Sequence, residues 1–120
     1  MLNIDKTALI DLKEWIDRCK GHYVPALVIS FVQGTNCTQI DQIAFGAYHN
    51  VKEAGEQFDV WKINGKELLV QKELVLLLRS DVLVKVTEGN KTRYEIKKRI
   101  LPWRIISRMM GGVFVIRKDA

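Results

Sequence analysis

The strongest constraint on the fold is a pair of alternating stretches separated by a two-residue turn. Val82–Glu88 and Lys91–Lys97 each alternate apolar and polar side chains, and Gly89-Asn90 lies between them. Successive side chains of a strand point to opposite faces, so this alternation predicts a half-buried strand on each side of a tight turn. The sequence therefore predicts a β-hairpin over residues 82–97. We expect one face to carry Val82, Val84 and Val86 across from Tyr94 and Ile96, and the other to carry Lys85.

Residues 5–20 have the periodicity of an amphipathic helix. Asp5 is a candidate N-cap, and Gly21 is a plausible stop. The apolar positions recur at helical spacing: Ala8, Leu9, Leu12, Trp15, Ile16 and Cys19. We expect this helix to mediate a possible homodimer, because a two-fold protein matches two half-sites on a duplex.

The next segment is apolar and its conformation stays open. In residues 24–33, Pro25 suits the first turn of a helix, whereas the β-branched residues allow a strand. Gly34–Asn36 is a turn signal, and Thr38–Asp41 resembles a capping box. An apolar stripe then predicts a helix to about residue 48 through Ile40, Ile43, Ala44 and Ala47.

The middle of the chain also leaves alternatives. Residues 49–57 are polar and form either a loop or a short helix. Phe58–Ile63 alternates, and the Asn64-Gly65 pair that follows marks either a hairpin or the approach to a largely buried helix over residues 66–80. Near the end, we expect a short helix over residues 103–110 and a final strand at Val113–Ile116.

Taken in order, these segments resemble a winged-helix DNA-binding domain. Ala26–Gly46 is similar to the first two helices of a helix-turn-helix, and Leu74–Val86 to the end of a third helix that leads into the wing. Thr87–Lys91 would then be the tip of the wing and Thr92–Ile96 its return strand. The resemblance implies a winged-helix-like α+β fold with an extra N-terminal helix and a C-terminal helix and strand extension. It implies a single domain with a helix at 1–21, a core at 24–97 and a basic extension at 98–120.

The charge is distributed unevenly along the chain. Residues 1–81 carry 9 basic and 11 acidic side chains, whereas residues 82–120 carry 10 basic and 3 acidic ones. A basic segment favours a polyanionic partner, because each Lys or Arg placed on a phosphate releases condensed counterions. We therefore expect a nucleic-acid-binding protein, a duplex DNA-binding transcriptional or replication accessory factor. The alternatives are a solubilising face, an acidic protein partner docked by the basic third, a membrane surface, and RNA or single-strand binding.

The resemblance also implies which residues contact the nucleic acid. The groove-facing candidates are Lys66, Gln71 and Lys72. The wing contacts would come from Lys85, Lys91, Arg93 and Lys97. The backbone-binding surface would be extended by Lys98, Arg99, Arg104 and Arg108.

Other functional classes have little support in the sequence. We expect no enzyme and no cofactor, because phosphate-binding, dinucleotide-binding, nucleophile-elbow and metalloprotease motifs are missing. Cys19, His22, Cys37 and His49 lack the two tight pairs typical of a zinc site, so we expect no metal. Met1–Lys6 has no basic flank before an apolar stretch, and we expect a cytoplasmic protein without a signal peptide.

Overall fold

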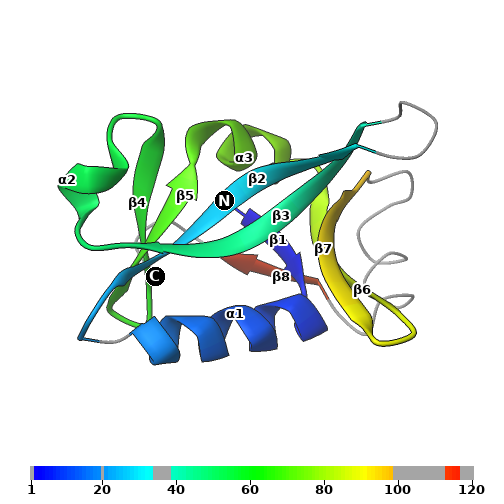
Figure 1. Ribbon diagram of the computed structural model, residues 1–120, viewed down its shortest axis with the longest axis horizontal. Coiled ribbons are helices and arrows are strands. Elements are labelled where there is room, and N and C mark those ends of the chain that lie inside the picture. Colours follow the sequence, from blue (N-terminus) through cyan, green and yellow to red (C-terminus); the bar gives the residue numbers. More distant parts are fainter. Residues whose placement is uncertain (1, 20, 34–38, 99–112, 117–120) are drawn as a thin grey trace.

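A computed structural model describes residues 2–19, 21–33, 39–98 and 113–116. Its eight strands form one mixed sheet in the order β4-β5-β2-β3-β7-β6-β1-β8 (Figure 1). The strands are β1 Leu2–Asp5, β2 Val24–Gln33, β3 Gln39–Tyr48, β4 Phe58–Ile63, β5 Lys66–Gln71, β6 Val82–Glu88, β7 Lys91–Lys97 and β8 Val113–Ile116. The helices are α1 Lys6–Cys19, α2 Val51–Ala54 and α3 Lys72–Leu77.

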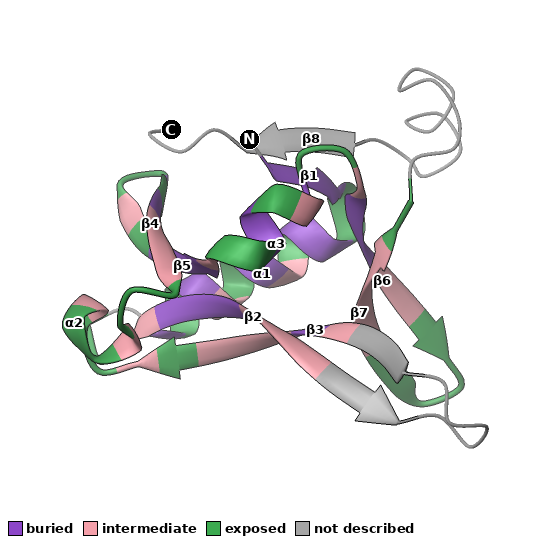
Figure 2. Cartoon of the chain, turned by 90° about the horizontal axis from the view of Figure 1, so that it is seen from above, coloured by how far each residue is buried: buried purple, intermediate pink, exposed green. Residues whose placement is uncertain are grey.

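The sheet curls into a half-barrel around two of the helices. Neighbouring strands pair antiparallel, except for the parallel pairs β1 with β6 and β2 with β5. Figure 1 shows α1 below the curled sheet and α3 on its upper side. In the view from above, the strands lie around both helices (Figure 2).

The core lies where the two helices meet the inner face of the sheet. Leu12 of α1 and Leu74 of α3 belong to one buried cluster with strand residues Leu27, Val70 and Leu83, each at most 1% exposed. Burying a side chain of this size contributes about 1.5–3 kcal/mol, so the inward residues of several strands together stabilise the curl.

The predicted N-terminal helix is confirmed. The Asp5 side chain caps α1, since its Oδ1 accepts a hydrogen bond from the backbone N–H of Ala8 at 2.7 Å. The helix ends before Gly21, whose φ of +84° lies in the left-handed region that glycine adopts without strain. Its apolar side packs into the chain's own core through Ala8, Leu9, Leu12, Ile16 and Cys19. The homodimer stays a prediction, and Ile10 is the large apolar residue that α1 exposes.

The winged-helix resemblance is wrong, because both segments assigned to the helix-turn-helix are strands. β2 and β3 pair antiparallel from Val24↔Tyr48 to Gln33↔Gln39. The strand alternative for residues 24–33 is therefore correct, and the helix predicted to about residue 48 is wrong. Ile43 and Phe45, two residues apart, both contact the core, which is the period of a strand. The turn predicted at Gly34–Asn36 lies outside the described residues.

The third predicted helix is also mostly wrong. Residues 66–71 form β5, and only Lys72–Leu77 are helical. Asn64 and Gly65 both have positive φ, 53° and 79°, and join β4 to β5, so the hairpin alternative is correct. β5 lies between β4 and β2, and Leu68, Leu69 and Val70 are all buried. A strand buried on both faces has a continuous apolar run that is hard to distinguish from a buried helix.

The hairpin over residues 82–97 and the last strand are confirmed. Val82, Val84 and Val86 share one face and Lys85 lies on the other, as predicted, but Tyr94 and Ile96 lie on the face of Lys85 and not across from the valines. Lys85 opposes Tyr94 and Leu83 opposes Ile96, so these four share the inner face.

The polar stretch 49–57 holds the four-residue helix α2. β8, from the predicted extension, joins the same sheet by pairing with β1, and the helix predicted over 103–110 lies outside the described residues. No winged helix or helix-turn-helix exists in the described ranges, so the prediction of a winged-helix transcription regulator loses its support.

Candidate functional site

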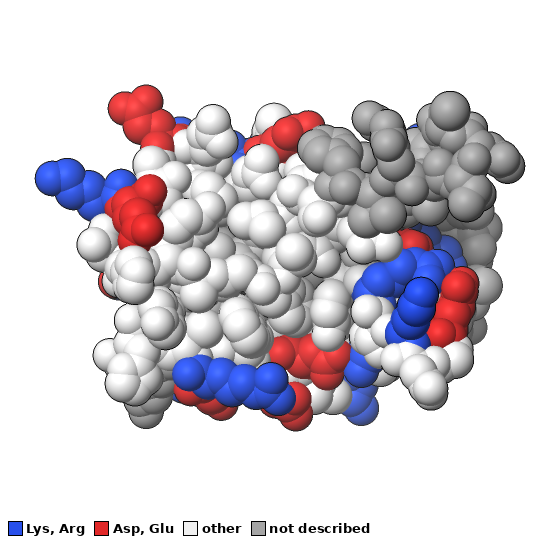
Figure 3. All heavy atoms as spheres, in the orientation of Figure 1, with Lys and Arg blue, Asp and Glu red and all other residues white. Residues whose placement is uncertain are grey.

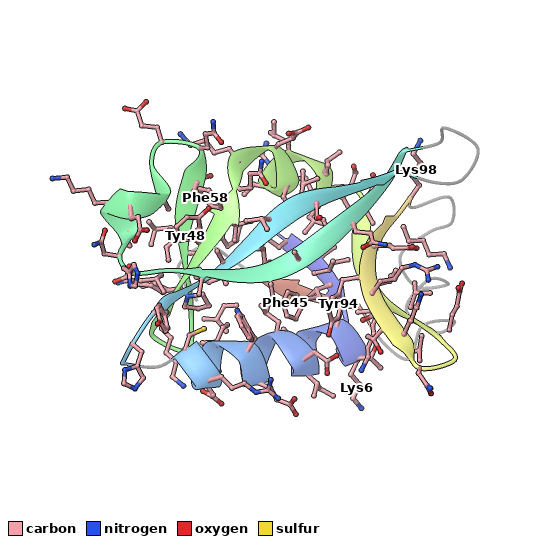
Figure 4. All side chains as sticks on the ribbon, in the orientation of Figure 1. Lys6, Phe45, Tyr48, Phe58, Tyr94 and Lys98 are labelled. Atoms are coloured by element: carbon pink, nitrogen blue, oxygen red, sulfur yellow. The ribbon has the colours of Figure 1, made fainter. Side chains whose placement is uncertain are left out.

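The outer face of β7 brings together three of the predicted nucleic-acid contacts. Tyr94 and Ile96 pack against the core, so the alternate positions lie on the opposite, outer face, which carries Lys91, Arg93, Glu95 and Lys97. Lys98 follows directly and is exposed at the end of the strand (Figure 4). We call Lys91, Arg93, Lys97 and Lys98 the β7 ribbon.

Arg93 is held in place by two carboxylates. Its Nη2 lies 3.0 Å from Glu88 Oε1, and its Nε donates to Glu95 Oε1. The hydrogen bond from Arg93 lowers the pKa of Glu88, and its two carboxylate partners raise the pKa of the guanidinium itself. Part of the positive charge of the ribbon is thus balanced locally. Figure 3 shows Lys and Arg side chains beside Asp and Glu side chains over β6 and β7.

The lysines of the ribbon are less constrained than Arg93. Lys91, Lys97 and Lys98 are all exposed. Within the ranges that the structure describes, these three lysines form no ion pair with a carboxylate. Their ammonium groups are therefore available to an external anion.

The other predicted contacts do not join this surface. Lys66 of β5 pairs with Asp17 of α1, and Lys72 is exposed at the start of α3. The Gln71 side chain is used inside the sheet, since its Oε1 accepts a hydrogen bond from the backbone N–H of Ile29 at 2.9 Å. Arg99, Arg104 and Arg108 lie outside the described residues.

Lys85, the remaining wing candidate, lies on the inner face of the sheet. Its Nζ is 2.8 Å from Asp11 Oδ2, and the same oxygen accepts a hydrogen bond from the Tyr94 hydroxyl at 2.7 Å. Burial opposes the charge on Asp11, but the bonds from Lys85 and Tyr94 outweigh it and hold the pKa of Asp11 below its usual value. The bond to Asp11 raises the pKa of Lys85, whereas burial, aided by that carboxylate, raises the pKa of Tyr94.

This triad lines a cavity of about 300 Å³ between α1 and the inner face of β3, β6 and β7, which we call the α1 cavity. Its aromatic walls are Trp15, Phe45 and Tyr94. Phe45 and Tyr94 stack with centroids 4.3 Å apart and planes at 21° (Figure 4). Trp15 is fixed by its Nε1–H, which donates to the Gly46 carbonyl at 2.9 Å. Glu14, Arg18 and Thr92 complete the lining.

The sequence patterns did not predict this cavity. The available signal was Lys85, a charged residue between the apolar positions Leu83 and Tyr94 of the inner face, together with Asp11 near Trp15 on α1. Assigning Lys85 to the outside of the hairpin hid that signal, because the register of β6 with β7 was misjudged. A volume of about 300 Å³ is at the lower limit for small-molecule sites.

The charge balance differs between the described and remaining residues. The described ranges contain 13 basic and 13 acidic residues, and the net +5 of the chain comes from the rest of the sequence.

No cluster of three or more potential metal ligands occurs in residues that the structure describes. None of the three helices has the length and apolar character needed to cross a membrane, as far as the described residues go.

No family model, curated protein or solved structure matches the chain.

Proposed function

We propose that this protein binds the phosphate backbone of nucleic acid through the β7 ribbon. The observation that carries the proposal is the register of the hairpin, which places Lys91, Arg93 and Lys97 on one outer face while Tyr94 and Ile96 face the core. Alternate residues of a strand are about 6.6–6.8 Å apart, so the cations form a row, interrupted by Glu95 between Arg93 and Lys97, rather than a single point. A row of cations suits a polymer of phosphates.

The chemistry of the ribbon fits sequence-independent binding. Lysine ammonium groups neutralise phosphates as point charges, and each contact releases a condensed counterion. The guanidinium of Arg93, held by Glu88 and Glu95, retains further N–H donors for a phosphate oxygen. The described elements include no helix-turn-helix, and so no recognition helix of that kind to read base edges in the major groove. The affinity for nucleic acid would therefore depend on the salt concentration more than on the base sequence.

A salt titration tests the proposal. The full chain is titrated against a random duplex, a single strand and an RNA at several ionic strengths. We expect binding at low salt and a slope of log K against log salt of about −3 to −4 on the duplex, for three or four phosphates. No binding to any of the three at low salt would overturn the proposal and favour an acidic protein partner.

A further inference from the structure

The α1 cavity opens where two strands of the sheet separate. β3 pairs with β7 at Gln42↔Glu95 and Ile43↔Tyr94, and among the described residues no ladder pair between these strands follows along β3 toward Phe45. In the same antiparallel register Phe45 would oppose Thr92, and both residues line the cavity instead. The Gly46 carbonyl, in the part of β3 that pairs with β2 but not with β7, accepts the Trp15 indole N–H. The segment Lys91–Arg93 therefore has a free edge toward β3.

This free edge connects the two faces of the hairpin. Lys91 and Arg93 belong to the β7 ribbon on the outer face, whereas Thr92, between them, lines the cavity on the inner face. A polymer whose backbone lies along the ribbon has a short route around this edge. One of its side groups can thus reach the cavity while its phosphates keep their contacts with Lys91 and Arg93.

The walls of the cavity indicate a flat ligand. Trp15, Phe45 and Tyr94 come from three different elements, and two of them are already stacked. Figure 4 shows Phe45 and Tyr94 side by side between α1 and the sheet. Aromatic faces bind planar rings by stacking, which needs little specific chemistry from the ring.

The polar groups indicate that the ligand is uncharged at its ring. Asp11 and Glu14 balance Lys85 and Arg18, so the lining has no net charge and gives a free phosphate no advantage. Asp11 Oδ2 accepts from both Lys85 and Tyr94. The other Asp11 oxygen, the Thr92 hydroxyl and the remaining N–H groups of Lys85 offer acceptors and donors to a ring edge. A nucleobase has these properties, because it is a planar, neutral ring with hydrogen-bond donors and acceptors along its edge.

We propose that the α1 cavity binds a single unstacked nucleobase. The base comes either from a single-stranded region of the nucleic acid held by the β7 ribbon or from a free nucleoside. For the first source the inference rests on the proposed function, and for the second it does not. Base pairing in a duplex keeps bases out of reach, so the cavity gives single strands an advantage that the ribbon alone lacks.

The test compares two polymers with the same phosphates. The full chain is titrated with a deoxyadenosine oligonucleotide and with an abasic oligonucleotide of equal length, at low salt, and separately with adenosine. We expect the abasic strand to bind about ten-fold more weakly. F45A should weaken binding of the adenine strand to the abasic level and leave the abasic strand unaffected.

A matched control is available on β4, an edge strand of the sheet. Phe58 makes an edge-on contact with Tyr48, with centroids 5.3 Å apart, and is half-buried like Phe45 (Figure 4). F58A should therefore leave the difference between the two strands unchanged. If F45A does not fold, the indole N–H resonance of Trp15 in the native chain, assigned with W15F, reports adenosine binding directly.

The outcomes separate the two proposals. Equal, salt-dependent binding of both strands, with no shift of Trp15 by adenosine, overturns the nucleobase site and leaves the proposed function in place. A Trp15 shift with adenosine and no binding of either strand overturns the proposed function and supports a free-nucleoside site. No binding of strands or adenosine overturns both.

Discussion

The Tyr94 hydroxyl donates a 2.7 Å hydrogen bond to Asp11, which joins β7 to α1 across 83 positions of sequence. The bond closes one side of the α1 cavity and places Tyr94 against Phe45. Lys85 binds the same carboxylate oxygen at 2.8 Å, so a helix and two strands meet at one acceptor. This junction makes the stability of the hairpin depend on the helix below it.

Removing the Tyr94 hydroxyl should weaken the contact between β7 and α1 while the aromatic ring stays in the wall of the α1 cavity. We expect Y94F to lower the free energy of unfolding by about 1–2 kcal/mol, because the lost bond is to a charged, partly exposed acceptor. Urea denaturation measures the change. Y23F is the control, since Tyr23 is exposed and its ring contacts His49 rather than the core. Equal losses in the two variants would contradict the role of the Tyr94–Asp11 bond.

The Asp11 carboxylate should make the stability of the folded chain depend on pH. The pKa of Asp11 is lowered in the folded chain, so the folded state favours the ionised form more than the unfolded state does. Its stabilisation is present above the unfolded pKa of about 3.9 and is lost as the pH falls through the lower, folded pKa. We expect D11N to flatten the fall of stability between about pH 4 and pH 2. Denaturation at several pH values checks this, with E14Q on the same helix as control, and a curve for D11N parallel to the native one would refute it.

Reversing two charges of the β7 ribbon should weaken nucleic-acid binding. We expect K91E with K97E to reduce affinity at low salt by at least about ten-fold and to reduce the salt slope by about 2. Both lysines are exposed and outside the core, so the fold should be kept. R93E is unsuitable, because it would place a third carboxylate beside Glu88 and Glu95.

The control for this charge reversal keeps the net charge equal. K13E with K52E changes two exposed lysines, on α1 and α2, by the same amount. Fluorescence anisotropy with a labelled duplex compares the two double variants. If both lose the same affinity, overall charge rather than the ribbon is responsible.

A buried amide in β1 should be important for stability. Asn3 is 1% exposed, and its Nδ2 donates to the carbonyls of Leu78 at 2.8 Å and Arg79 at 3.0 Å. N3A removes both bonds and leaves the buried Leu78 carbonyl and the partly buried Arg79 carbonyl with fewer donors, so we expect a loss of about 1–3 kcal/mol in urea denaturation. N90A, in the exposed hairpin turn, should cost less than N3A. An unchanged midpoint for N3A would show that the amide has no net effect.

Local patterns predicted the elements whose signals are contained within a few residues. The cap at Asp5 and the stop at Gly21 mark α1, and the turn at Gly89-Asn90 marks one hairpin, whereas the Asn64-Gly65 turn left a hairpin and a helix as alternatives. Each signal depends on backbone geometry at one position, so a single sequence is enough to read it.

Long-range pairing decided the elements that were mispredicted. Ile40, Ile43, Ala44 and Ala47 have helical spacing, but β3 forms because β2 pairs with it along ten residues. The cavity was missed for a similar reason. It depends on where β3 and β7 separate and on α1 crossing below them, and neither relation is encoded within a short window.

The position of β1 has a consequence for the folding of the chain. β1 lies between β6, with which it is parallel, and β8, with which it is antiparallel. Both hydrogen-bonding edges of β1 are therefore satisfied only by strands that lie far along the chain. Because unpaired edges recruit strands from other molecules, a partly folded chain in which residues 113–116 have not yet docked on β1 would be prone to aggregate.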